Sequence, residues 1–284
     1  LDSLEVSISK AIESAKNNPY KPQVIIASTI KGKGVKSTEE MSSGGHGYPL
    51  KPFDPKLEDF IKEIYENSPI PVEISNWINE IRDLQEIEVK DSKDLPAVKK
   101  QKIQVGVSKA LISLAEENFP IVSITSDLAG STGVAGFQKA YPEKTFDIGV
   151  AESNMVSMAS GFSNNDFIPV VDTFAQFGVT KGNLPLIMAN INQTPIVAIF
   201  SHTGFQDAAD GASHQSTTYI SAVSSIPNTK VFNLSCSSQA EQVIKQEIKE
   251  FHQSRENGET PKSLIFFLGR ENFPESYPEL EDQS

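Results

Sequence analysis

The chain has 284 residues, of which 38% are hydrophobic and 22% are charged, a balance typical of globular domains. Its formal net charge of −12 argues against nucleic acid as a main partner and leaves no sign of a basic membrane-binding face. One cysteine, Cys236, excludes an internal disulfide framework, and no apolar run approaches the roughly 20 residues of a membrane span. We therefore expect a cytoplasmic protein that binds neither nucleic acid nor a membrane.

The first 85 residues combine helical patterns with a long glycine-rich loop. The loop runs over residues 31–47 and contains His46, and loops of this length in compact domains are usually functional or disordered. Trp77 lies in a helical pattern and is predicted to be a packing residue. The apolar spacing predicts, in chain order, a helix over 3–16, a buried strand over 24–28, and helices over 56–66 and 73–85.

Residues 86–96 are charged and aperiodic, and they are interpreted as an interdomain linker. After them, short apolar runs alternate with helical patterns, which predicts an α/β domain over 97–275 and a fraying tail over 276–284. We expect a mostly parallel sheet covered by helices on both faces. The predicted strands are 121–125, 145–149, 167–172, 195–200, 231–234 and 264–268, and the predicted helices are 99–117, 153–163, 179–190, 215–224 and 238–251.

A glutamate and two phenylalanines follow successive strands of this pattern. Glu152 comes just after the strand 145–149, and Phe174 and Phe177 follow the next strand. Because loops at the carboxyl ends of parallel strands carry the chemistry of such sheets, these side chains are candidates for one site. A carboxyl group beside aromatic rings suits an aromatic nitrogen heterocycle, since the rings stack on its face and the acid shares a proton with its nitrogen.

Two histidines and an aspartate share the loop after the strand 195–200. His202, Asp210 and His214 could bind a metal, relay protons or hydrogen-bond a polyol. Metal binding is the least favoured of these, because the ligands lack helical i,i+4 spacing and no thiolate accompanies them. No metal ligand is therefore predicted in this chain.

Anion-binding groups follow two further strands. Asp127 leads into Gly130-Ser131-Thr-Gly, where backbone N–H groups are available to an anion, although Asp127 could equally be a helix N-cap. Arg270 follows the strand 264–268, and its guanidinium fork suits a phosphate because it donates two parallel hydrogen bonds.

The run His202, Asp210-Gly211, Ser213-His214-Gln215 resembles the pattern of transketolases, as do Glu152 with its phenylalanine pair and Arg270 before Asn-x-Pro. The related deoxyxylulose-phosphate synthases usually have an arginine where His202 stands, which favours transketolases. The segments Thr29-Ile-Lys-Gly-Lys-Gly34 and Gly45-His46-Gly-Tyr-Pro-Leu50 are similar to those that close the diphosphate-binding domain of the family. The resemblance covers nearly the whole chain.

The resemblance implies a thiamine-diphosphate-binding fold over 97–275. Residues 1–85 are then the C-terminal part of the diphosphate-binding domain with a helical extension, the tail of a second α/β domain. It also implies transfer of a two-carbon ketol unit from a ketose phosphate to an aldose phosphate with thiamine diphosphate, in the pentose phosphate pathway. The implied roles are Glu152, Phe174, Phe177 and Asp127 toward the cofactor, Ser131, His202, Asp210, His214, Arg270 and His46 toward the sugar, and Glu152, His46, His202 and His214 in catalysis.

The chain also departs from the family pattern. It lacks the Gly-Asp-Gly motif for the cation, so Mg²⁺ or Ca²⁺ is expected to be bound mainly by residues outside this chain. Lysine and glutamine replace an arginine over residues 99–104, and Thr180-Lys181 replaces another. The chain opens without Met in what looks like mid-helix, so we expect an incomplete enzyme, either a fragment or a split subunit. A homodimer or a complementary subunit would supply the rest of the diphosphate domain.

Two alternatives remain open from the sequence. One is a catalytically silent transketolase-like subunit, which the missing cation motif supports and the intact set of Glu152, His202, Asp210 and His214 opposes. The other is a β-subunit-like component of a 2-oxo acid dehydrogenase, which should lack the His46 segment.

Overall fold

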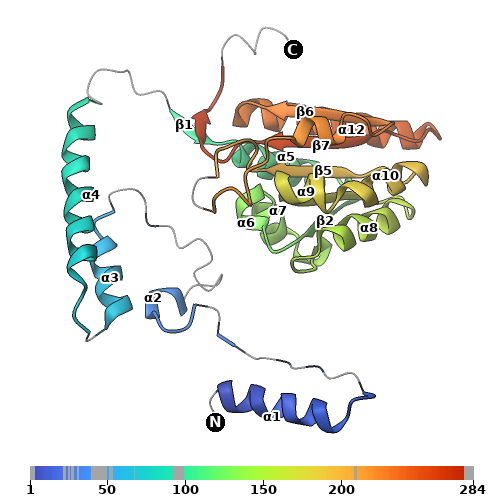
Figure 1. The fold of residues 1–284 in the computed structure, drawn as a ribbon. Helices are drawn as coiled ribbons and strands as arrows, with labels where there is room; N and C mark the ends of the chain where they lie inside the picture. The colour runs from blue at the N-terminus through green and yellow to red at the C-terminus, as the bar shows by residue number, and fades with distance from the viewer. Residues whose placement is uncertain are drawn as a thin grey trace. The chain divides into compact units, whose positions relative to one another are not determined.

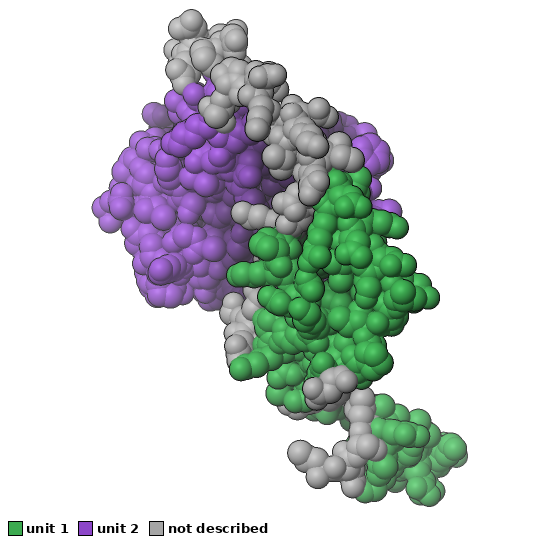
Figure 2. All heavy atoms as spheres, turned by 90° about the vertical axis from the view of Figure 1, so that its left-hand side faces the viewer, with its two compact units in different colours: residues 1–95 green, residues 96–284 purple. Residues whose placement is uncertain are grey.

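The computed structural model describes residues 4–21, 24, 26, 29–30, 32–39, 50, 54–66, 68–91, 99–207 and 210–277. The chain divides into two compact units, residues 1–95 and residues 96–284, called unit 1 and unit 2 below (Figure 2). Among the described helices, none combines the length and the apolar character needed to cross a lipid bilayer.

The described secondary structure of unit 1 consists of helices. Its helices are α1 (Leu4–Asn17), α2 (Lys36–Glu39), α3 (Leu57–Tyr65) and α4 (Val72–Asp91). The Glu63 carboxylate ties α3 to α2, because it accepts hydrogen bonds from the Ser37 N–H at 2.7 Å and from its hydroxyl at 2.6 Å. An ion pair between Arg82 and Glu58 joins α4 to α3. The three helices predicted in this unit are confirmed. The linker predicted over 86–96 is wrong for residues 86–91, because α4 continues to Asp91, and residues 92–96 lie outside the described residues.

Two predictions for unit 1 are wrong. The strand predicted over 24–28 is wrong at Val24 and Ile26, which lie outside any strand and are 81% and 89% exposed, and residues 25, 27 and 28 lie outside the described residues. Trp77 is 45% exposed and is not a packing residue. The buried residue is its neighbour Ile78, whose side chain points about 100° away around the axis of α4. His46 lies outside the described residues.

Unit 2 is built on a parallel sheet of six strands. The strands are β2 (Ile121–Thr125), β3 (Thr145–Asp147), β4 (Ile168–Phe174), β5 (Val197–Ser201), β6 (Thr229–Leu234) and β7 (Ser263–Leu268). Their order is β3-β2-β4-β5-β7-β6, and every neighbouring pair is parallel. Because strands covered on both faces have no solvent side, β2, β4, β5 and β7 are buried at every residue. The predicted α/β fold is confirmed.

Helices cover both faces of this sheet (Figure 1). They are α5 (Gln104–Glu116), α6 (Ala129–Thr132), α7 (Ala135–Ala140), α8 (Glu152–Ser163), α9 (Ala175–Thr180), α10 (Asn183–Ile191), α11 (Tyr219–Val223) and α12 (Ser237–Glu256), with a 3₁₀ turn, η1 (Pro142–Lys144). The first core packs α5, α7 and α12 on one face, and the second packs α8, α9, α10 and α11 on the other.

Three predicted helices of unit 2 are shorter or divided in the structure. The helix predicted over 99–117 begins only at Gln104, because β1 (Lys100–Lys102) pairs antiparallel with β8 (Asn272–Pro274). The predicted helix 179–190 is two helices, α9 and α10, which meet at residues 181–182. The helix predicted over 215–224 is reduced to α11. Strand pairing between distant segments overrides local helical spacing at the first of these places.

The packing of α5 against α12 depends on a glycine. A Cβ at Gly106 would overlap the Ser237 carbonyl oxygen and lie 2.9 Å from the Ala240 Cβ. By contrast, a Cβ at Gly161 in α8 would have no atom within 4 Å.

We expect Gly106→Ala to lower the free energy of unfolding by roughly 2 kcal/mol or more, because the two helix backbones must separate. The matched variant Gly161→Ala should raise it by roughly 0.5–1 kcal/mol, through better helix propensity alone. Urea unfolding measures both. Equal effects of the two variants would contradict the close helix contact.

A carboxyl group lies inside the central strand β4. Asp172 Oδ2 accepts hydrogen bonds from the Thr125 hydroxyl at 2.9 Å and the Thr132 hydroxyl at 2.6 Å, which ties α6 to two strands. Its Oδ1 has no hydrogen-bond partner among the described residues. Burial raises the pKa of Asp172 from its usual 3.8 to about 7. Below about pH 7 the folded protein therefore favours the protonated acid.

The raised pKa of Asp172 predicts a pH-dependent stability. Between about pH 4 and about pH 7 the folded state holds a proton that the unfolded state has lost, so the free energy of unfolding falls as the pH rises, by about 1.4 kcal/mol per pH unit. We expect Asp172→Asn to be more stable than the native protein at about pH 8, with the gain shrinking toward about pH 4. The exposed Asp166→Asn is the control, and urea titrations across pH measure both. A gain that does not vary with pH would be inconsistent with this account.

Candidate functional site

The carboxyl ends of three neighbouring strands bring the candidate residues together. Phe174 ends β4, His202 directly follows β5, and Arg270 comes two residues after β7. The strands lie in the order β4-β5-β7, with Phe174 paired to Ser201 and Phe200 paired to Phe267. Side chains at 174, 202 and 270 therefore emerge at one edge of the sheet, where α/β proteins place their ligands.

Four aromatic rings lie at the centre of this edge, those of Phe174, Phe177, His202 and His214. These four side chains are called the ring cluster below. Phe174 and Phe177 are stacked with centroids 6.2 Å apart and planes 23° apart. The His202 ring lies 4.0 Å from Phe174, and His214 meets Phe177 edge-on at 5.0 Å. Phe177 is three residues after Phe174, one turn into α9, and so points the same way. The ring cluster is a packed set of four aromatic rings in which Phe174 and His202 are buried and Phe177 is half-buried.

His202 is held in an uncommon backbone conformation. Its φ is +61°, its side chain is 5% exposed, and its Nδ1 lies 2.9 Å from the Ser201 hydroxyl. Burial, and then the Arg270 cation, lower the pKa of His202 from its usual value of 6.5 to about 3. The imidazole is therefore neutral at physiological pH and can exchange one hydrogen bond as donor or acceptor.

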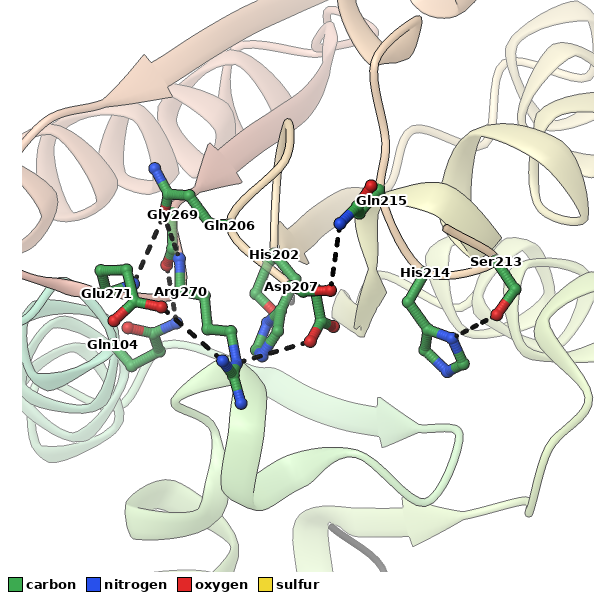
Figure 3. Close-up of polar contacts among 11 residues, drawn as sticks. Gln104, His202, Gln206, Asp207, Ser213, His214, Gln215, Gly269, Arg270 and Glu271 are labelled. Carbon is green, nitrogen blue, oxygen red and sulfur yellow. Dashed lines mark hydrogen bonds and ion pairs between the residues drawn. The ribbon is translucent and has the colours of Figure 1, made fainter. Parts of the chain in front are cut away.

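Asp210 and His214, which the sequence groups with His202, lie on the loop after β5. His214 Nδ1 lies 2.9 Å from the Ser213 hydroxyl (Figure 3). The loop is closed by backbone bonds from the Gly204 N–H to the Ser216 carbonyl at 2.7 Å and from the Gly211 N–H to the Asp207 carbonyl at 3.1 Å. The exposed Asp210 lies near enough that its charge acts to raise the pKa of His202.

Arg270 is positioned by side chains from two other segments. Gln206 Oε1 accepts hydrogen bonds from the backbone N–H of Arg270 at 2.7 Å and of Glu271 at 3.3 Å. Gln104 in α5 donates to the Gly269 carbonyl at 3.0 Å. The guanidinium makes ion pairs with Asp207 and Glu271 (Figure 3). Sequence reasoning singled out Arg270 but missed Gln206 and Asp207.

Glu152 is the first residue of α8 and is 7% exposed. The next residue, Ser153, donates a 2.6 Å hydrogen bond to the Lys181 carbonyl, just past the end of α9. Because α9 carries Phe177, this bond fixes the start of α8 against the helix of the ring cluster. The carboxyl group is thus buried in the fold and does not face open solvent.

Asp127 and Ser131 lie at the carboxyl end of β2. Asp127 is exposed with φ +61°, and its N–H donates to Asp147 Oδ1 at 3.1 Å. Leu128 occupies the N-cap position of α6, so the alternative of Asp127 as that cap is wrong. Ser131 is half-buried within the short α6.

The phenylalanine rings and Glu152 suit a flat heteroaromatic group. The half-buried Phe177 ring can present an apolar face, and the buried carboxyl group of Glu152 on the adjoining α8 can share a proton with a ring nitrogen. Across the described ranges, no group of three or more His, Cys, Asp or Glu side chains is placed to hold a metal ion.

The sequence model of the transketolase pyrimidine-binding domain matches residues 99–274. Human transketolase is 30% identical over 231 residues, which cover 78% of this chain and 36% of that protein. A 1-deoxy-D-xylulose-5-phosphate synthase from Clostridium acetobutylicum is also 30% identical, over 142 residues that cover 50% of this chain and 23% of that protein. The chain thus spans less than half the length of these curated relatives.

A solved structure of transketolase from Campylobacter jejuni superimposes with a TM-score of 0.52 at 22% identity, covering 95% of this chain and 45% of that one. At this identity the likeness shows the fold alone. The match over residues 99–274 shows the family as well. The chain belongs to the transketolase family, and these residues form its pyrimidine-binding domain, which has a thiamine-diphosphate-dependent fold.

Proposed function

We propose that this chain supplies the pyrimidine-binding side of an enzyme that transfers a two-carbon ketol unit from a ketose to an aldose with thiamine diphosphate. The observation that carries the proposal is the ring cluster, in which stacked Phe174 and Phe177 are bordered by His202 and His214. A stacking surface and sugar-binding imidazoles then share one edge of the sheet. His202 supports ketol transfer over the synthase reaction, because the synthases usually have an arginine there.

In this proposal the cofactor's pyrimidine is held by Phe177 and Phe174, with Phe177 as the direct stacking partner. Glu152 shares a proton with the ring nitrogen, and its burial strengthens that hydrogen bond. Asp127 lies on the cofactor side. When bound, thiamine diphosphate supplies the electron sink that cleavage of the bond beside a ketose carbonyl requires.

The sugar is assigned to the other side of the ring cluster. His202, as a neutral imidazole, exchanges hydrogen bonds with a sugar hydroxyl and leaves proton movement to groups with higher pKa values. His214 and Asp210 reach the same space from the loop after β5. Ser131 and Arg270 are assigned to the far end of the sugar, where the sequence predicts a phosphate. His46 stays a predicted contributor.

The remaining parts of the enzyme are assigned to other chains. Residues 1–85 are proposed to be the C-terminal part of a diphosphate-binding domain, completed by a second copy or by a complementary subunit. Mg²⁺ or Ca²⁺ is assigned mainly to residues of that other part.

Glu152→Gln tests the proposal in the assembled holoenzyme. We expect kcat to fall by about 10²-fold or more, because the amide cannot share the proton, while the unfolding temperature stays unchanged. The exposed Glu143→Gln is the matched control and should keep native turnover. Turnover within about twofold of native in Glu152→Gln would end the assignment. A native holoenzyme without ketol transfer would instead favour a catalytically silent subunit.

The protonation state of His202 can be measured directly. We expect its ring nitrogens to keep the chemical shifts of a neutral imidazole down to about pH 4, because burial and Arg270 disfavour the cation. Proton–nitrogen correlation spectra of the full chain follow this. A titration midpoint near 6.5 would show that the ring is solvated.

With the lowered pKa, the stability that neutral His202 contributes is complete above about pH 6.5 and is lost as the pH falls toward 3.

A further inference from the structure

The backbone of the segment that carries Arg270 is hydrogen-bonded to two glutamine side chains (Figure 3). Gln206 Oε1 accepts from the N–H of Arg270 at 2.7 Å and from the N–H of Glu271 at 3.3 Å. The buried Gln104 donates to the Gly269 carbonyl at 3.0 Å. Because residues 269–271 follow the end of β7, side chains from α5 and from the loop after β5 bond to their backbone groups.

Gln206 can approach this segment because residue 269 is a glycine. A Cβ at Gly269 would lie 2.6 Å from Gln206 Oε1 and 2.7 Å from the nearest atom of the Phe273 ring. Both distances are shorter than a carbon atom allows, so any other residue at position 269 would displace the glutamine or the ring. The glycine is therefore matched to the hydrogen bonds that Gln206 makes with the segment.

The loop after β5 is joined to the end of β7 at a second point. Thr203, which directly follows His202, donates to the Leu268 carbonyl from its N–H and from its hydroxyl, both at 3.2 Å. Hydrogen bonds at Thr203 and at Gln206 thus join the loop to the residues on both sides of the strand end. His202 and Arg270 therefore have positions that are fixed relative to each other through shared backbone contacts.

The position of the Arg270 backbone matters for the binding of a phosphate. A guanidinium binds a phosphate through two parallel N–H groups, so its affinity depends on the direction from which it approaches. A misplacement of about 1 Å in a group that positions a substrate can cost about 10²-fold in rate. The Gln206 amide is neutral, so it can set this position without adding a charge to the site.

We propose that Gln206 is a positioning residue for the phosphate end of the sugar, and that it acts by fixing the backbone of Arg270 at the end of β7. The inference rests on the proposed function, in which Arg270 is assigned to the sugar phosphate. The role requires an acceptor oxygen at position 206 and a residue without a Cβ at position 269.

The first test measures hydrogen exchange of the Arg270 and Glu271 amides in the full chain by NMR. Gln206→Met keeps the length of the side chain but removes the acceptor, so we expect it to raise both exchange rates by about 10-fold or more. Gln206→Glu keeps an acceptor oxygen and should leave them within about threefold of native. Gly269→Ala should raise them as Gln206→Met does, because the new Cβ displaces the oxygen. Native exchange rates in Gln206→Met would overturn the inference.

The second test compares KM and kcat of the assembled holoenzyme for D-ribose and for its terminal phosphate ester as acceptors, with hydroxypyruvate as the donor. We expect Gln206→Met to raise KM for the ester by about 10-fold and to leave kcat within about twofold, because the phosphate contact is equal in the ground and transition states. KM for D-ribose should stay native. Gly269→Ala breaks the same contact, so the double variant should be no worse than the more damaging single variant.

Arg270→Gln separates this inference from the proposed function. If it raises KM for the ester and Gln206→Met does not, the inference is wrong and the assignment of Arg270 stands. If Arg270→Gln leaves KM native for both acceptors, the phosphate assignment of the proposed function fails, and the inference fails with it. Equal losses with both acceptors in Gln206→Met would also overturn the inference, because they would indicate a general structural effect.

Discussion

The register of three buried parallel strands is the constraint on which the site depends. β4, β5 and β7 are hydrogen-bonded side by side, so the residues that follow them emerge at one edge of the sheet. Phe174, His202 and Arg270 are far apart in the chain and meet only there. A slip of one residue in any strand would turn its side chains to the opposite face. The apolar cores on both faces hold the strands against such a slip.

The same burial sets the electrostatics of the domain. Low solvation keeps His202 neutral and favours the protonated form of Asp172. Asp172 lies on β4, and His202 follows the neighbouring strand β5. It also raises the pKa of Asp207, where the neighbouring Asp210 acts in the same direction and Arg270 opposes it. Asp172 accepts hydrogen bonds from two hydroxyl groups and so anchors α6, whereas Asp207 Oδ1 lies 3.6 Å from Arg270 Nε.

Much of the fold follows from local patterns. All six strands of the main sheet were predicted from their apolar runs, and the signal is clearest for β2, β4, β5 and β7, which are covered on both faces. The predictions fail where pairing or packing with a distant segment determines the local structure. Residues 100–102 pair with β8 instead of joining the helix that follows, and Trp77 turns out of the packed side of α4. Val24 and Ile26 have strand character without a described neighbour to pair with.

The sequence by itself determined the alternation of strands and helices, the family, and most candidate site residues, because Glu152, the phenylalanine pair and the histidine motif are local signatures. Only the tertiary structure decided which of them touch. The Asp207–Arg270 pair joins segments 63 residues apart, and Thr132 reaches Asp172 from 40 residues away. The periodic pattern of the sequence does not predict such contacts, because they form only when the sheet brings the ends of separate strands to one edge.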